Sequence, residues 1–211
     1  MSKSADRRMG VKQMRKANWM TTALLAAVSS FALAGAAHAQ TCAENTFGAK
    51  TGQVYLDAEN ELLGNKNPQA ALAKLNQLRA MPELNCYERG AMLRLSAAIR
   101  IETGNRAGAI ADLEEAIRVG AITGADIQQT YYNMGQLMLQ DNNIPKAKEY
   151  MLRWINSGAR PTRDQNWQMA IIFQKLDDYR GALPYAERVL QQDGANASDQ
   201  VIDFLIFLYD R

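Results

Sequence analysis

Residues Gly104–Ile117, GNRAGAIADLEEAI, form the stretch from which the fold of this chain can be predicted. Its first two residues indicate a turn, and Ala109, Leu113 and Ala116 then follow at the i, i+4, i+7 spacing of one helical stripe. Small residues on such a stripe allow a second helix to pack closely against the first. The stretch therefore predicts one half of a helical hairpin.

The pattern of this stretch occurs four times along the chain. Each copy begins with a turn that contains Asn or Asp, and an alanine then occupies the same place, at Ala71, Ala109, Ala147 and Ala182. Successive alanines are 38, 38 and 35 residues apart. A period of this size is typical of a solenoid of repeats. The four stripes are Ala71, Leu75 and Leu78; Ala109, Leu113 and Ala116; Ala147, Met151 and Trp154; and Ala182, Ala186 and Val189.

The first 39 residues have the composition of a secretory signal peptide. Six basic residues and one acidic residue precede the apolar run Ala23–Ala37, and small residues lead up to Ala39. We expect cleavage before Gln40 and a periplasmic mature protein. A retained membrane anchor is the less favoured alternative, because Ser29 and Ser30 interrupt a run that is shorter than about 20 apolar residues. General secretion and the twin-arginine route both remain open for export.

Charge and composition exclude several classes of function. The whole chain has a net charge of +2, but residues 40–211 carry 18 basic and 21 acidic side chains, a net charge of −3, which argues against nucleic acid and anionic lipid as partners. The only histidine, His38, lies in the segment expected to be removed. Without histidine the mature chain lacks the base of a Ser-His or Cys-His relay and the commonest ligand of catalytic zinc. We therefore expect no enzyme activity, no cofactor and no metal.

Two cysteines, Cys42 and Cys86, are the only ones in the chain. They are too far apart in sequence for a CxxC redox pair. In an oxidising compartment they can form one disulfide, which would stabilise the fold by about 2–4 kcal/mol. Two unpaired thiols are the alternative, because the sequence does not give the distance between them.

The 3.6-residue pattern predicts an all-α chain of nine helices without strands. Residues Gln40–Lys50 are small and polar, and we expect a flexible lead-in there, followed by a helical domain over residues 51–211. Pro184 is expected within the first turn or so of its helix, where proline is tolerated. The first helix starts at Thr51 and is lined by Val54, Tyr55, Ala58, Leu62 and Leu63. The others are Pro68–Met81, Cys86–Glu102, Arg106–Val119, Asp126–Gln140, Pro145–Asn156, Arg163–Leu176, Arg180–Gln191 and Ser198–Tyr209.

This arrangement resembles the tetratricopeptide repeat, a helix-turn-helix unit of about 34 residues. Around the repeated alanines, the early aromatic position falls on Tyr55, Leu93, Tyr131 and Asn166, and the small contact site on Ala97, Gly135 and Ala170. Glu59, Arg100 and Asn166 depart from the pattern. The resemblance implies a right-handed solenoid of four repeats, at about residues 52–85, 90–123, 128–161 and 163–196, with a C-terminal capping helix at residues 198–209.

A narrower resemblance covers about Thr51–Leu190. The phrase Leu84–Met92, Trp154 in the third repeat and Asn166-Trp167 in the fourth look like a family of exported bacterial repeat proteins described as components of the TonB energy-transduction system. The resemblance implies a periplasmic partner in the TonB–ExbB–ExbD machinery, or a TonB-dependent outer-membrane transporter.

Binding residues are expected on the concave face, which the first helices of such repeats build. Aromatic side chains there give contact area at low entropy cost, amides pair with peptide backbone, and arginine can bind a carboxylate. Tyr132 and Trp167 are alternatively core residues if the frame is shifted by one position. The inward positions carry Asn60, Arg94, Tyr132, Gln136, Trp167 and Gln174.

The last predicted helix is a second candidate surface because it is apolar on most of its circumference, leaving a narrow polar stripe of Asp199, Asp203 and Asp210. It either packs over the fourth hairpin with a few apolar residues exposed, or carries self-association or a partner. The sequence as a whole predicts a periplasmic protein–protein interaction scaffold, and the narrower resemblance implies an association with TonB-dependent transport. The alternative is an adaptor in cell-wall or outer-membrane assembly.

Overall fold

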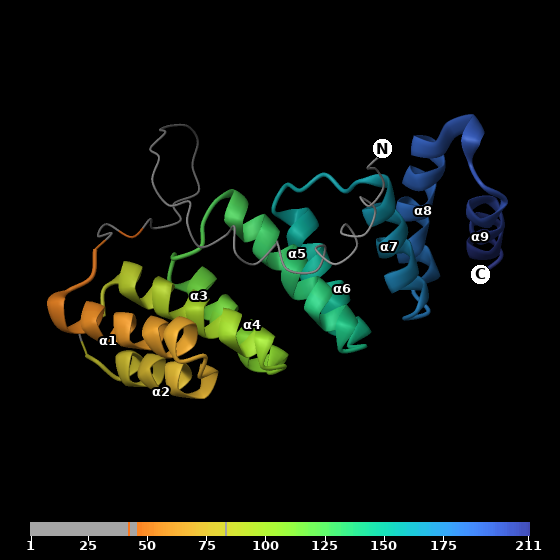
Figure 1. Cartoon of the computed structure of the whole chain (residues 1–211). Helices are drawn as coiled ribbons and strands as arrows, with labels where there is room; N and C mark the ends of the chain where they lie inside the picture. Colours follow the sequence, from red (N-terminus) through yellow and green to blue (C-terminus); the bar gives the residue numbers. More distant parts are fainter. Residues whose placement is uncertain (1–41, 43–45, 83) are drawn as a thin grey trace, which may run out of the picture. The chain divides into compact units, whose positions relative to one another are not determined.

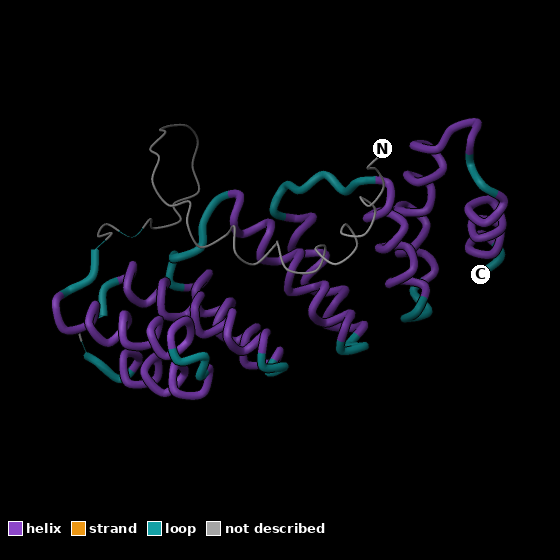
Figure 2. Tube along the Cα trace, viewed as in Figure 1, coloured by secondary structure: helices purple, strands orange, loops and turns teal. Residues whose placement is uncertain are grey.

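The computed structural model describes residues 42, 46–82 and 84–211, and nine α-helices lie within these ranges (Figure 1). No β-strand occurs among the described residues (Figure 2). The prediction of an all-α helical-repeat fold is confirmed. The expected signal peptide, residues 1–39, lies outside the described part of the chain.

Eight of the helices form four consecutive pairs, and the ninth follows the last pair. The first helix continues into one π-helical turn, Asn60–Gly64, before the chain enters the second helix. The pairs are α1 (Ala49–Glu59) with α2 (Pro68–Arg79), α3 (Cys86–Glu102) with α4 (Arg106–Arg118), α5 (Ala125–Gln140) with α6 (Ile144–Asn156), and α7 (Arg163–Gln174) with α8 (Tyr179–Asp193), followed by α9 (Asp199–Tyr209).

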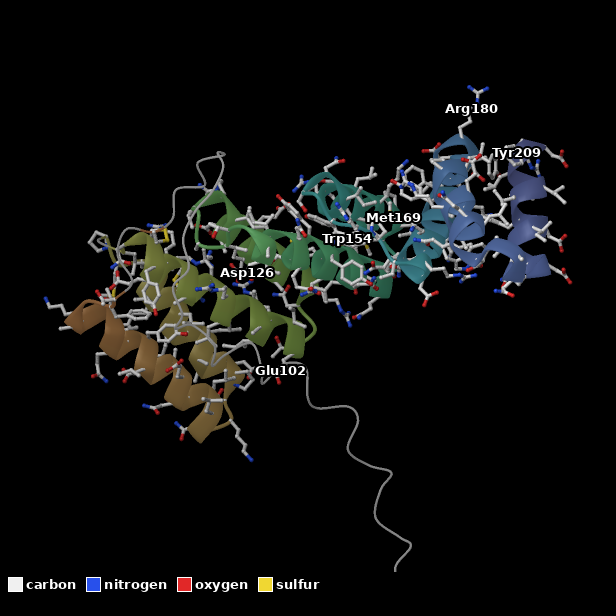
Figure 3. All side chains as sticks on the ribbon, turned by 90° about the horizontal axis from the view of Figure 1, so that it is seen from above. Glu102, Asp126, Trp154, Met169, Arg180 and Tyr209 are labelled. Carbon is white, nitrogen blue, oxygen red and sulfur yellow. A yellow bond between two sulfur atoms is a disulfide. The ribbon has the colours of Figure 1, made fainter. Side chains whose placement is uncertain are left out.

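The helices of each pair pack against each other, and the second helix of a pair contacts the first helix of the next pair. Helix α9 packs against α8, so it continues the series. Buried residues accordingly form clusters that follow one another along the chain. Trp154 of α6 and Met169 of α7 lie close together (Figure 3) in the cluster that joins the third pair to the fourth and to α9.

The four repeated alanines are among the most deeply buried residues of their hairpins. Ala71, Ala109, Ala147 and Ala182 each have 0% of their surface exposed. A larger side chain at these places would push the two helices apart, because the distance between packed helices depends on the side chains at the contact. Gly135 of α5 also allows the two helices of its pair to approach closely, because a Cβ there would lie 3.0 Å from the Met151 side chain of α6.

Each hairpin also has the same turn four residues before its alanine. The residue that caps the second helix is Asn67, Asn105, Asn143 or Asp178, and its side-chain oxygen accepts the backbone N–H three residues later at 2.9–3.2 Å. The residue just before each cap has a positive φ angle of 52–81°. The preceding residues are Lys66, Gly104, Asn142 and Asp177.

The start of the helical domain is held against α3. Cys42 and Cys86 form a disulfide with a Cα–Cα distance of 5.2 Å, and the Phe47 ring lies 5.4 Å from that of Tyr87 on α3. Helix α1 begins at Ala49, so residues 49 and 50 belong to it and not to a flexible lead-in. The first helix therefore begins two residues before its predicted start at Thr51.

A buried carboxylate completes this attachment. Glu88 is 2% exposed, caps α3 together with Asn85, and accepts hydrogen bonds from the Thr51 hydroxyl, the Gly48 N–H (2.8 Å) and the Asn85 N–H (2.9 Å). Burial by itself raises the pKa of Glu88, but the three hydrogen bonds outweigh this effect and lower the pKa below the ordinary glutamate value. The ionised carboxylate therefore stabilises the junction between α1 and α3.

A second buried carboxylate joins the first two hairpins. Asp112 of α4 is 3% exposed, accepts from Ser96 at 2.5 Å, and lies 2.5 Å from the Arg79 guanidinium and 3.0 Å from that of Arg100. Arg100, a departure from the repeat pattern, thus has a structural partner. Removing both arginines would leave the Asp112 carboxylate buried without a counter-charge.

Three local expectations are wrong. Leu63 is 74% exposed, because it follows Leu62 by one residue and so turns about 100° away from the packed side of the helix. Helix α8 begins at Tyr179 after the Asp178 cap, so Pro184 lies inside the helix rather than near its first turn. Helix α7 ends at Gln174, two residues earlier than expected, because the Asp177-Asp178 turn needs the intervening residues.

Enlarging a repeated alanine should destabilise the fold. Ala109→Leu adds three carbon atoms at a site with no exposed surface, and we expect the free energy of unfolding to fall by about 1–3 kcal/mol. Ala111→Leu, at an exposed position of the same helix, is the matched control and should stay within about 0.5 kcal/mol of wild type. Urea unfolding followed by circular dichroism measures both. Equal losses would contradict the packing role.

Replacing the buried glutamate should weaken the fold in a pH-dependent manner. Glu88→Gln should lower the free energy of unfolding at pH 7 by about 1–3 kcal/mol, because an ionised acceptor of three hydrogen bonds is lost. A lowered pKa stabilises the folded state above the unfolded-state pKa of about 4.3 and ceases to do so as the pH falls through the folded-state pKa. The difference between the two proteins should therefore shrink below pH 5. Glu102→Gln, at an exposed site on α3, is the control and should show no such convergence.

Candidate functional site

The predicted binding residues lie on the first helices of the pairs and on the turn after α1, as the repeat frame requires. Asn60 and Arg94 are exposed, whereas the other four are half-buried. They do not form one cluster: Asn60 lies in the turn after α1, Arg94 on α3, Tyr132 and Gln136 on α5, and Trp167 and Gln174 on α7.

The two predicted residues of α5 are engaged in internal contacts. The Tyr132 ring lies 4.9 Å from the ring of Trp154 on α6, so its ring is part of the packing within the third pair. The Gln136 amide exchanges hydrogen bonds of 2.8 and 3.4 Å with the Gln168 amide, which ties α5 to α7. The Tyr132 ring therefore packs α5 against α6, and only the Gln136 amide links α5 to α7.

The two predicted residues of α7 line a groove that α7 forms with α9, here called the α7–α9 groove. It has a volume of about 680 Å³. Three apolar or aromatic side chains besides Trp167 line it, together with amides and one carboxylate. Its residues are Trp167, Ile171 and Gln174 of α7 and Gln200, Asp203, Phe204 and Phe207 of α9.

A smaller hollow lies on the other side of Trp167. It has a volume of about 400 Å³ and shares Trp167 and Ile171 with the α7–α9 groove. The indole and Ile171 therefore form a common wall between the two concavities. The remaining lining residues are Leu139, Asn142, Ile144, Gln168, Ile172 and Lys175.

Helical spacing places the groove residues on matching faces. Trp167, Ile171 and Gln174 follow one another at i, i+4 and i+7 on α7, while Phe204 and Phe207 are one turn apart on α9. The Trp167 ring meets the Phe204 ring edge-on at 5.1 Å, with an interplanar angle of 64°. A partner side chain entering the groove would therefore contact aromatic and aliphatic surface.

Helix α9 divides its apolar residues between three directions. Val201, Leu205 and Leu208 are buried, and Phe204 and Phe207 line the groove. The opposite flank leaves Ile202, Ile206 and Tyr209 exposed by 42%, 55% and 63%, with Tyr209 (Figure 3) donating a hydrogen bond of 2.6 Å to Glu187. The helix thus packs over the fourth hairpin and also leaves an apolar flank exposed.

The groove offers binding chemistry rather than the groups of a catalytic centre. Its only titratable lining residue is Asp203. Within residues 46–82 and 84–211, together with Cys42, no cluster of three or more His, Cys, Asp or Glu residues could hold a metal. No helix in these same ranges is long and apolar enough to cross a membrane.

Helix α9 completes the groove, and its position beside α7 is not evident from the sequence. Phe204 and Phe207 belong to the second candidate surface predicted on the last helix, but the sequence does not indicate that they lie beside Trp167. A signal was present, since Phe204 follows Trp167 by 37 residues, close to the spacing of the repeated alanines. Helix α9 therefore takes the place of the first helix of a further repeat.

Comparison with known proteins shows likeness of fold alone. No protein-family model matches the chain, and no curated protein matches it. The solved structure of PilW, a widely conserved type IV pilus biogenesis factor, aligns over 74% of this chain and 67% of its own, at 11% identity and a TM-score of 0.46. Pseudomonas aeruginosa pilF aligns over 76% of this chain and 67% of its own, at 13% identity and a TM-score of 0.43. BtubC from P. vanneervenii aligns over 77% and 72%, at 13% identity and a TM-score of 0.43.

Proposed function

We propose that this protein is a periplasmic protein–protein interaction scaffold that docks a partner in the α7–α9 groove. The supporting observation is the groove itself, in which Trp167, Ile171, Phe204 and Phe207 line a volume of about 680 Å³. Mostly apolar concave sites with a few polar groups are typical of binding sites, and aromatic residues are prominent among those that dominate binding energy. The stacked helical pairs supply a rigid support for such a site.

The partner that we propose is a component of the TonB–ExbB–ExbD machinery or a TonB-dependent outer-membrane transporter. This part of the proposal rests on the resemblance over Thr51–Leu190, which includes Trp154 and the Asn166-Trp167 pair. Of these, Trp167 lines the groove, whereas Trp154 and Asn166 are buried at 7% and 2% exposure. An adaptor role in cell-wall or outer-membrane assembly would use the same groove with a different partner.

Affinity capture from detergent-solubilised envelopes should distinguish these partners. We expect the wild-type protein to retain TonB, ExbB or ExbD, and Trp167→Ala to lose at least about nine-tenths of that signal, as expected for an aromatic residue that dominates an interface. Tyr209→Ala is the matched control, because it removes an exposed aromatic side chain from the opposite flank of α9. Circular dichroism verifies that each variant is folded. Capture of wall synthases or assembly factors in place of TonB components would favour the adaptor role, and equal capture by both variants would contradict the groove.

A further inference from the structure

We propose that the α7–α9 groove selects a cationic amphipathic segment of its partner protein, in which one apolar face enters the groove and lysine or arginine side chains lie along α9. This inference rests on the proposed function, because it specifies the chemistry of the segment that the same groove would bind. It identifies the segment by charge and apolarity and is independent of which envelope protein carries it.

The first observation is an acidic stripe along the edge of the groove. Asp203 lines the groove, Asp199 precedes it by four residues, and Asp210 follows it by seven. At 100° per residue these three carboxylates lie within about 40° of one another around the helix. All three side chains are exposed. The edge of the groove on α9 therefore presents negative charge over about three turns.

The second observation is that these carboxylates form no ion pair within the described part of the chain. None of the three takes part in an ion pair there. Acids elsewhere do have partners, as in Asp141 with Arg106 at 2.7 Å and Asp193 with Arg163 at 2.8 Å. The stripe thus differs from carboxylates that link one hairpin to the next.

The basic group nearest to this stripe in sequence is directed at aromatic rings. Arg211 follows α9, and its guanidinium lies 4.9 Å from the centre of the Phe207 ring and 5.7 Å from that of Tyr179. Phe207 is itself part of the groove lining. The groove surface thus already holds a cation against its aromatic wall, as expected from the attraction of ring faces for guanidinium groups. Arg211 thus lies against a ring and not against the stripe, and lysine or arginine from a partner would find carboxylates that form no ion pair.

Apolar and charged features occur on adjacent sides of α9. Phe204 and Phe207 form part of the apolar lining of the groove. Asp203, the residue before Phe204, lies at the edge of the groove. An apolar side chain on the floor would therefore be accompanied by a cation that reaches Asp203, and further cations spaced by three or four residues would reach Asp199. A purely apolar segment would leave the carboxylates without counter-charges. An anionic segment, or a phosphate-rich membrane surface, would be repelled by them.

Fluorescence anisotropy with labelled peptides tests this preference on the full protein. The probe is a synthetic 14-residue amphipathic peptide with leucine on one face and lysine on the other, and its counterpart replaces every lysine with glutamate. We expect the lysine peptide to bind at least about tenfold more tightly at 0.05 M salt. Its affinity should fall several-fold at 0.3 M salt, because exposed charge pairs are screened.

Charge variants locate the preference on α9. The combined variant Asp199→Asn, Asp203→Asn and Asp210→Asn should weaken binding of the lysine peptide about fivefold or more, as three exposed ion pairs would allow. The matched control replaces three exposed acids on other helices, as Glu102→Gln, Asp126→Asn and Asp164→Asn, and changes the net charge equally. Binding to this control should change less than twofold. Equal weakening by both triple variants would contradict the inference.

Groove variants separate this inference from the proposed function. Trp167→Ala should abolish binding of the lysine peptide, and Phe207→Ala, which leaves Trp167 in place, gives a second test should the first variant unfold. If both peptides bind equally well and only the groove variants matter, the cationic preference is wrong and the groove function stands. If the charge variants matter but the groove variants do not, the peptide binds outside the groove and the inference is overturned. A third outcome is that neither peptide binds and light scattering shows a dimer that Phe207→Asp dissociates. A second copy of the chain then occupies the groove, and the inference is overturned. If neither peptide binds and no dimer forms, the groove is not a docking site.

Discussion

The fold depends on close contact between two helices at a fully buried alanine, repeated in each of the four hairpins. This contact requires a side chain small enough for the helices to approach and a turn that returns the chain at the right distance. The turn and the small side chain lie within six consecutive residues of each hairpin. A positive-φ residue and a capping Asn or Asp precede each alanine by five and four positions, so the chain direction and the packed face are set together. Because the unit is local, it can be repeated and stacked in chain order.

Most of this architecture could be predicted from the sequence because its determinants are local. The spacing of Ala71, Ala109, Ala147 and Ala182 gives the phase of every second helix, and Asn or Asp before each one gives its beginning. The buried Asp112 could not be predicted, because its partners Arg79 and Arg100 come from different helices and no spacing rule links them. Pairwise burial of charge is a property of the stacked structure and leaves no periodic signal.

The candidate site was predictable in part for the same reason. Trp167 and Gln174 belong to the first-helix face, which the repeat frame identifies. The groove, however, needs α9 beside α7, and that placement follows from tertiary packing of Val201, Leu205 and Leu208. Tyr132 and Gln136 lie on the same type of face, but Tyr132 packs against Trp154 and Gln136 forms hydrogen bonds with Gln168. A shared frame thus indicates which face a residue lies on, while neighbouring helices decide whether the residue remains available to a partner.

Thiol accessibility directly measures whether the four alanines are buried between paired helices. The wild-type structure has no free cysteine among its described residues, so a single introduced cysteine is the only free thiol there. Cysteine is introduced singly at Ala71, Ala109, Ala147 and Ala182, because its side chain is only slightly larger than that of alanine. Under native conditions each should react with a maleimide reagent on the order of 100-fold or more slowly than exposed controls at Ala73 and Ala111, because reaction needs opening of the hairpin. Equal rates at the repeated and control positions would show that these alanines face solvent and would contradict the account.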